Sequence, residues 1–106
     1  MIKYLNFTGN MSYLYLTKTI LQLMQADPLK SQFLFTIKNK TLYITKVSEQ
    51  EIKKIENPCV RSMKKTGNGW GIYFTQSILD LIDINPQKDK AEILLDEQTI
   101  SVKKAK

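Results

Sequence analysis

The chain has 106 residues, of which 42% are hydrophobic and 25% charged, a composition typical of one small globular domain. It contains no histidine and a single cysteine, Cys59, so it lacks the usual general base, the commonest metal ligand and any intrachain disulfide. We therefore expect no enzyme, no catalytic residues, no metal site and no cofactor.

Sixteen Lys and Arg residues against ten Asp and Glu residues give the chain a net charge of +6. This charge favours a partner that carries phosphate groups or an acidic protein surface. The N-terminus lacks the basic and apolar segments of a secretion signal, and no segment approaches the roughly 18 apolar residues that cross a bilayer. We therefore expect a cytoplasmic protein that does not contact a membrane.

The first copy of an internal repeat begins with two strands and a helix. A short strand from Ile2 to Phe7 leads through a Gly9-Asn10 turn to a second strand that ends at Leu16. Thr17 has the side chain of a helix N-cap, and Asp27-Pro28 is expected to end the helix. The predicted apolar face of this helix consists of Ile20, Leu21, Leu23 and Met24.

A hairpin completes the first copy. Apolar residues occur at every second position on both sides of a polar turn at Asn39-Lys40. These apolar residues are Phe33, Phe35, Ile37, Leu42 and Ile44. The copy is therefore predicted to have the order ββαββ.

Residues 47–58 join this copy to the next one. Ser48 and Glu51 have the spacing of a capping box, which predicts a short helix from Glu49 to Glu56. Asn57-Pro58 is expected to end it. We interpret this segment as a tether.

Residues 59–104 repeat residues 1–46 at a constant shift of 58 and without a gap. Thr8-Gly9-Asn10 aligns with Thr66-Gly67-Asn68, and twelve of the 46 aligned pairs are identical. The second copy is predicted to have a strand from Val60 to Lys65, a second strand that ends at Phe74, and a helix N-cap at Thr75. Its helix is expected to end before Asn85-Pro86 and to have an apolar face of Ile78, Leu79, Leu81 and Ile82. Its hairpin is expected to turn at Glu97-Gln98, with inward-facing residues Ala91, Ile93, Leu95, Ile100 and Val102. Similarity that stays in register over this length indicates a duplication.

This order of elements, with Lys64-Lys65 directly before Thr66-Gly67-Asn68, resembles the swapped-hairpin DNA-binding domain of the AbrB and MazE families (SpoVT-AbrB). The resemblance covers both copies. It implies a mostly β fold with short helices, in which two ββαββ units interleave their strands into one small barrel. It also implies that the basic face of that barrel binds DNA.

The size of each copy predicts how the copies assemble. A unit of about 46 residues is too small to bury a satisfactory core alone, and the tether, residues 47–58, can span about 40 Å when extended. We therefore expect residues 1–106 to form a single pseudo-dimeric domain, with the two copies paired inside one chain. The expected particle is a monomer of 12.3 kDa with an internal pseudo-two-fold axis, and further dimerisation stays open.

Cations beside an exposed turn are suited to phosphate contacts. The predicted DNA-binding residues are Arg61, Lys64, Lys65, Asn68, Lys3 and Asn10, with most contacts from the second copy. The alternative is a solvated basic edge whose lysines only prevent a strand from aggregating. A second set, Trp70, Tyr73 and Tyr15, could stack on a base or contact a partner, and the alternative for these three residues is packing within the fold.

Asp80 and Asp83 lie one helical turn apart, and we interpret them as a solvated helix face because no other catalytic group accompanies them.

Taken with the basic residues and the resemblance, the sequence predicts a small transcriptional regulator, of the repressor type, that binds double-stranded DNA. Because fused and diverged copies need not read identical half-sites, its target would be an asymmetric or pseudo-palindromic sequence. The alternative is a protein-binding antitoxin or inhibitor that holds a partner such as a toxin on the same barrel.

Overall fold

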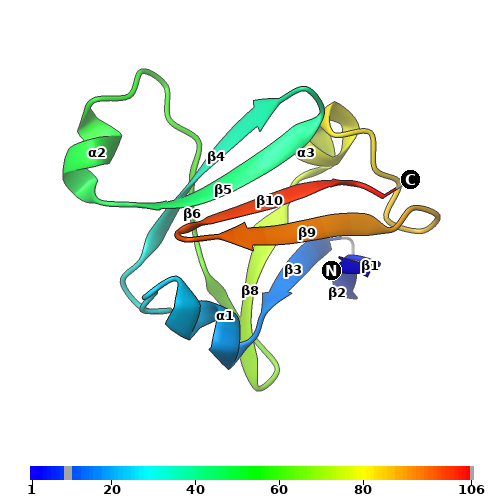
Figure 1. Ribbon diagram of the computed structural model, residues 1–106, viewed down its shortest axis with the longest axis horizontal. Helices are drawn as coiled ribbons and strands as arrows, with labels where there is room; N and C mark the ends of the chain where they lie inside the picture. Colours follow the sequence, from blue (N-terminus) through cyan, green and yellow to red (C-terminus); the bar gives the residue numbers. More distant parts are fainter. Residues whose placement is uncertain (9–10, 106) are drawn as a thin grey trace.

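The structure is a computed structural model that describes residues 1–8 and 11–105, with Thr8 described in its backbone only. Within these residues, ten strands and three short helices are formed (Figure 1). In chain order they are β1 (Ile2–Lys3), β2 (Asn6–Thr8), β3 (Met11–Leu16), α1 (Lys18–Leu23), β4 (Gln32–Lys38), β5 (Thr41–Val47), α2 (Glu49–Lys53), β6 (Val60–Ser62), β7 (Lys64–Thr66), β8 (Gly69–Phe74), α3 (Gln76–Leu81), β9 (Ala91–Asp96) and β10 (Thr99–Lys104). No helix of the described chain is long and apolar enough to cross a membrane.

The strands form two antiparallel sheets that mix the two halves of the chain. The six-stranded sheet has the order β1-β9-β10-β5-β4-β6, and the four-stranded sheet has the order β2-β3-β8-β7. The first strand of each half therefore pairs with the hairpin of the other half: β1 with β9, and β6 with β4. The fold is mostly β, as the sequence predicts.

The pairing registers have the symmetry that a shift of 58 residues requires. Ile2 lies opposite Glu92 on one side of the molecule, and Val60 lies opposite Leu34 on the other. In the four-stranded sheet, Leu14 lies opposite Ile72, its own equivalent, so a pseudo-two-fold axis passes between these two residues. As a result α1 and α3 lie at opposite ends of the molecule (Figure 1).

The predicted barrel does not close, because the strands form two separate sheets. The expected single strands Ile2 to Phe7 and Val60 to Lys65 are each broken in two, and each half joins a different sheet. Leu5 and Met63 stand at the equivalent breaks and are buried, with 4% and 6% of their surface exposed. At each of these residues the side chain points into the core, and the backbone leaves the six-stranded sheet and enters the four-stranded sheet.

The helices begin where the sequence predicts and end earlier than expected. Thr17 Oγ1 accepts a hydrogen bond from the Ile20 amide at 3.2 Å, and Thr75 Oγ1 caps α3 in the same way. Each helix then closes through a left-handed residue, Gln25 (φ 54°) or Asp83 (φ 59°), two residues before the expected stop. The 2.9 Å bond from the Ala26 amide to the Leu21 carbonyl, with its counterpart from Ile84 to Leu79, completes this ending.

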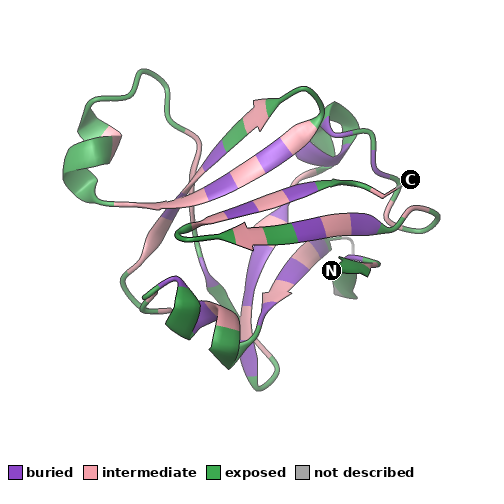
Figure 2. Cartoon of the chain, in the orientation of Figure 1, coloured by how far each residue is buried: buried purple, intermediate pink, exposed green. Residues whose placement is uncertain are grey.

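The prediction of the apolar helix faces is wrong for two residues, because Leu23 and Leu81 are 62% and 60% exposed. In helices of six residues they point about 100° away from the stripe that the other apolar residues form. The remaining predicted positions are buried or half-buried, and the hairpin strands alternate in burial as expected (Figure 2).

One continuous core lies between the inner faces of the two sheets and the helices. Leu14, Ile72 and Phe74 contribute from the four-stranded sheet, and Phe33 and Ile44 from the six-stranded sheet, all with at most 1% of their surface exposed. Phe35 and Phe74 connect the sheets directly, with ring centroids 6.0 Å apart. Close packing of these side chains fixes the orientation of one sheet relative to the other, and so determines which faces of the sheets point outward.

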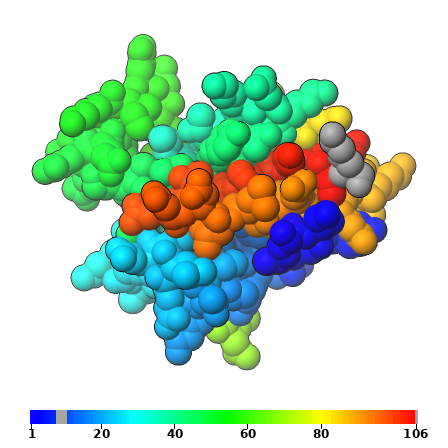
Figure 3. Space-filling view, viewed as in Figure 1, coloured from blue at the N-terminus to red at the C-terminus, as the bar shows by residue number. Residues whose placement is uncertain are grey.

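The tether stands apart from the core as an exposed lobe (Figure 3). Its helix α2 is shorter than predicted, but the predicted capping box is present. The Ser48 amide donates to Glu51 Oε1 at 3.0 Å, and the Glu51 amide donates to Ser48 Oγ at 3.2 Å. With so little burial, this reciprocal cap is the main local support of α2.

We expect the cap of α2 to open in acid. The backbone and side-chain hydrogen bonds with Ser48, helped by the charge of Lys54, lower the pKa of Glu51 from its ordinary 4.5. A group whose pKa is lowered by folding contributes its stability above the ordinary value and loses it as the pH falls through the lowered value. The amide shift of Ser48 in a nuclear magnetic resonance titration should follow this transition, and in a Glu51→Gln variant that transition should be absent. A wild-type midpoint at or above 4.5 would contradict the cap.

Candidate nucleic-acid interface

The β7–β8 hairpin carries an exposed basic edge. Lys64 and Lys65 lie on β7, which is an outer strand of the four-stranded sheet, and both side chains are exposed. Gly67 adopts a left-handed φ of 58° in the turn, and Asn68 beside it is exposed. The turn projects from the lower end of the molecule in Figures 1 and 3, so these polar groups can reach an extended partner.

Tyrosine side chains cover the outer face of the same sheet. Register places Tyr13 directly opposite Tyr73, and their rings stack with centroids 5.0 Å apart. Lys64 Nζ lies 5.7 Å from the centroid of the Tyr73 ring, and the Tyr73 hydroxyl is 2.8 Å from Thr66 Oγ1. We call Tyr13, Tyr15 and Tyr73 the tyrosine face, and the basic edge of β7 borders it.

Two glycines of β8 make room for the tyrosine face. A Cβ atom at Gly69 would overlap the ring of Tyr15, and one at Gly71 would lie 2.9 Å from Cδ2 of Tyr13. The rings of β3 therefore lie directly against the backbone of β8. Contact of this kind covers strand glycines that would otherwise expose the backbone to water and leave the strand weakly packed.

Replacing Gly69 by alanine is expected to displace the Tyr15 ring and to lower the free energy of unfolding by about 1–2 kcal/mol. In the double variant Gly69→Ala/Tyr15→Ala the new methyl group meets no ring, so its cost should fall to a few tenths of a kcal/mol. Urea denaturation of the wild type, both single variants and the double variant measures this coupling. Strictly additive costs would show that Tyr15 does not cover Gly69.

The charge of the four-stranded sheet is of one sign. None of its strands contains an aspartate or glutamate, whereas β7 contributes two lysines. The acidic residues lie instead on the tether, around α3 and on β9 and its turn, apart from Asp27 after α1. A phosphate backbone that approaches the tyrosine face would therefore meet Lys64 beside the Tyr73 ring, with Lys65 on the other side of the same edge strand, and no carboxylate from the sheet itself.

The remaining predicted contact residues are not all in one place. Arg61 lies on β6, directly before the basic edge, and its half-buried guanidinium donates to the Val60 carbonyl at 3.2 Å. Lys3 is its equivalent on β1, at the opposite edge of the six-stranded sheet, so the structure separates it from the β7 lysines. Asn10 lies outside the described residues.

Trp70 does not share the tyrosine face. It lies opposite Leu16 and Lys65 on the inner side of β8, is half-buried and packs against the core. This is the packing arrangement that the sequence left as the alternative for this residue.

Sequence reasoning missed Tyr13, which completes the face. The available signal was its spacing, because Tyr13 and Tyr15 lie two residues apart in a predicted strand and must point the same way. Its contact with Tyr73 depends on the register between strands from different halves, and the repeat hides it because the equivalent of Tyr13 is Gly71.

Comparison of the chain with protein-family models, curated proteins and solved structures found no match. The geometry and charge of these surfaces are therefore the basis for a proposed function.

Proposed function

We propose that this protein is a small DNA-binding transcriptional regulator that uses the basic β7–β8 hairpin and the tyrosine face on double-stranded DNA. The observation that carries the proposal is a four-stranded sheet whose strands contain no acidic residue. Its outer face combines Lys64 with the tyrosine hydroxyls, and the same hairpin adds the exposed side chains of Lys65, on the opposite side of β7, and Asn68. These are the groups that bind phosphate oxygens and base edges in protein–DNA complexes.

We further propose that the fold is an intramolecular pseudo-dimer of the AbrB and MazE swapped-hairpin kind, in an open two-sheet form. The exchange of first strands, β1 to β9 and β6 to β4, supports this interpretation. So does the pairing of β3 with β8 about the pseudo-two-fold axis. The duplication then replaces a second subunit, and a single chain supplies both halves of the DNA-binding sheet.

In this proposal the two halves play unequal roles. Lys64 and Lys65 neutralise phosphates, Arg61 assists from β6, and Asn68 reaches into a groove from the tip of the hairpin. At the equivalent positions to the two lysines, the β2 strand carries Asn6 and Phe7. One hairpin is therefore basic and the other uncharged, which suits a target that is not a perfect palindrome.

Selection of bound duplexes from a random pool tests this function. We expect an asymmetric or pseudo-palindromic motif to be enriched, and the affinity for it to fall with salt at a slope of log K against log salt of about −2.7, for three phosphate contacts. Absence of binding to any duplex at low salt and micromolar protein would overturn the proposal. That result would favour the alternative of a protein-binding antitoxin or inhibitor.

A further inference from the structure

A hollow of about 800 Å³ lies on the inner side of the four-stranded sheet, at the edge opposite the basic hairpin. Phe7 of β2 and Phe74 of β8 form part of its wall, together with Leu79 of α3 and Ile84. Ser12 of β3 lines it as well. The volume is in the range of natural small-molecule pockets.

Comparison of the two copies of the repeat indicates which kind of ligand would fit the hollow. Ser12 is equivalent to Trp70, since the two residues are 58 positions apart. Both are on the inner side of their strand, Ser12 opposite Phe74 and Trp70 opposite Leu16, and Phe74 and Leu16 are themselves equivalent. One half of the molecule thus fills this position with an indole ring that packs against the core, and the other half has a small hydroxyl side chain beside a hollow.

The hydroxyl of Ser12 is available to a ligand. The residue is only 3% exposed, yet among the described residues its Oγ forms no hydrogen bond. Because Ser12 lines the hollow, a donor that enters the hollow can use its hydroxyl oxygen as an acceptor. An indole or similar N–H group could donate to this oxygen.

Carboxylates surround the hollow in a chain that is otherwise basic. Asp80, Asp83 and Asp89 all line it, and Lys104 is the cation that approaches two of them, with Nζ 4.0 Å from Asp83 and 3.8 Å from Asp89. No three of the described acidic or cysteine side chains form a group that could hold a metal ion. The excess negative charge favours a cation, and the apolar wall formed by Phe7, Phe74 and Leu79 favours an organic one.

We propose that this hollow is a binding site for a small aromatic cation. The aromatic ring occupies the position that Trp70 fills in the other half, its N–H donates to Ser12 Oγ, and its ammonium group lies among Asp80, Asp83 and Asp89. This site is independent of the proposed DNA-binding function, because it lies at the β2 edge of the sheet and the basic hairpin lies at the β7 edge.

Calorimetric titration with tryptamine tests the site. We expect saturable binding by the wild-type chain, with amide resonances of Ser12 and Leu79 shifted on saturation. Indole-3-propionate, which has the same ring and an opposite charge, should bind at least tenfold more weakly. No saturable binding of tryptamine up to millimolar concentration, or equal binding of both compounds, would overturn the proposal.

Two variants locate the binding. Ser12→Trp should fill the hollow from within, as Trp70 does in the other half, and should weaken tryptamine binding at least tenfold. Asp80→Asn/Asp83→Asn should weaken it to a similar degree without adding volume, so the test holds even if the tryptophan variant does not fold. Asp96→Asn removes a carboxylate on β9 that does not line the hollow and should leave the affinity unchanged. Wild-type affinity in the double asparagine variant would overturn the proposed site.

Discussion

Replacing both Lys64 and Lys65 by alanine is expected to lower the affinity for duplex DNA about 30-fold, because each lost phosphate contact costs roughly 1 kcal/mol of binding free energy. The two side chains are exposed on an outer strand of a sheet whose strands hold no carboxylate, so their removal changes the electrostatic potential of this whole edge. Each lost contact also releases one counterion fewer on binding. The salt slope should therefore become less negative by about 2 in fluorescence anisotropy titrations.

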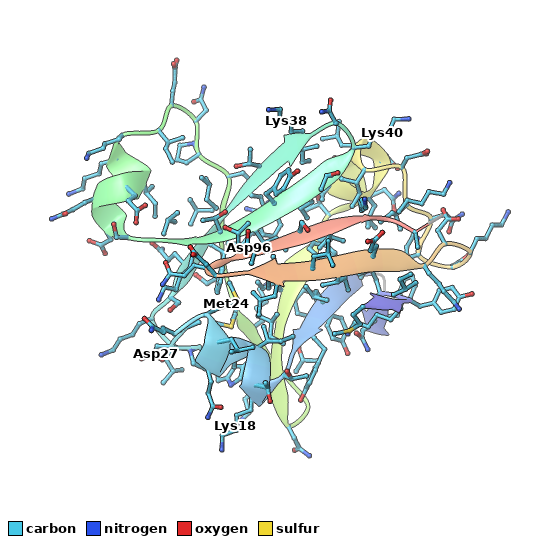
Figure 4. All side chains as sticks on the ribbon, in the orientation of Figure 1. Lys18, Met24, Asp27, Lys38, Lys40 and Asp96 are labelled. Atoms are coloured by element: carbon cyan, nitrogen blue, oxygen red, sulfur yellow. The ribbon has the colours of Figure 1, made fainter. Side chains whose placement is uncertain are left out.

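A charge-matched control separates local contact from net charge. Lys38→Ala/Lys40→Ala removes the same two positive charges from the β4–β5 turn, at the other end of the molecule from the β7–β8 turn (Figure 4). This variant should keep the wild-type salt slope and lose less than threefold in affinity. Equal losses in the two double variants would show that binding follows net charge and would contradict the basic hairpin as the contact site.

Replacing Phe74 by alanine is expected to lower the free energy of unfolding by about 3–5 kcal/mol. The side chain is 1% exposed, ends the central strand β8 and meets Phe35 of the six-stranded sheet. Removing it leaves a cavity between the two sheets at a place where both are anchored. For a small domain of ordinary stability this loss would bring the chain close to unfolding at ambient temperature.

Leu29→Ala provides the comparison for this loss. Leu29 is 81% exposed, so its truncation should change the free energy of unfolding by no more than about 0.5 kcal/mol. Urea denaturation monitored by circular dichroism measures both variants. Similar midpoints for the two variants would contradict a single core shared by both sheets.

The N-cap residues, the turn residues and the alternation of apolar residues predicted the starts of the helices and most of the strands. Thr17 and Thr75 cap the helices as expected because a hydroxyl before an apolar stripe has one obvious local partner. The strand breaks at Leu5 and Met63 were not predictable in the same way. They depend on burial at the corner between two sheets, and an alternating strand pattern alone contains no sign of that corner.

The candidate site was predictable to the extent that it is local. Lys64, Lys65 and Asn68 belong to one hairpin, so their proximity follows from its sequence. The stacking of Tyr13 on Tyr73 and the separation of Lys3 from Arg61 follow from how the halves pair. Contacts between strands that are about sixty positions apart require the register, which only the assembled sheets define.

Ser12 and Trp70 occupy equivalent positions in the proposed pseudo-dimer and differ in size and polarity. Two identical subunits would carry the same residue twice, whereas in the proposed intramolecular pseudo-dimer one of these positions is filled and the other borders a hollow. The same divergence gives one basic hairpin and one neutral hairpin. In our proposals, these two asymmetries separate a ligand site from a DNA-binding site at opposite edges of one sheet.

Amide resonance mapping of the isotope-labelled protein during titration with a selected DNA duplex tests the central proposal most directly. We expect the perturbed resonances to concentrate on residues 64–73 and around Tyr13 and Tyr15. Perturbations confined to the outer face of the six-stranded sheet or to α2, or none at all at saturating DNA, would contradict it.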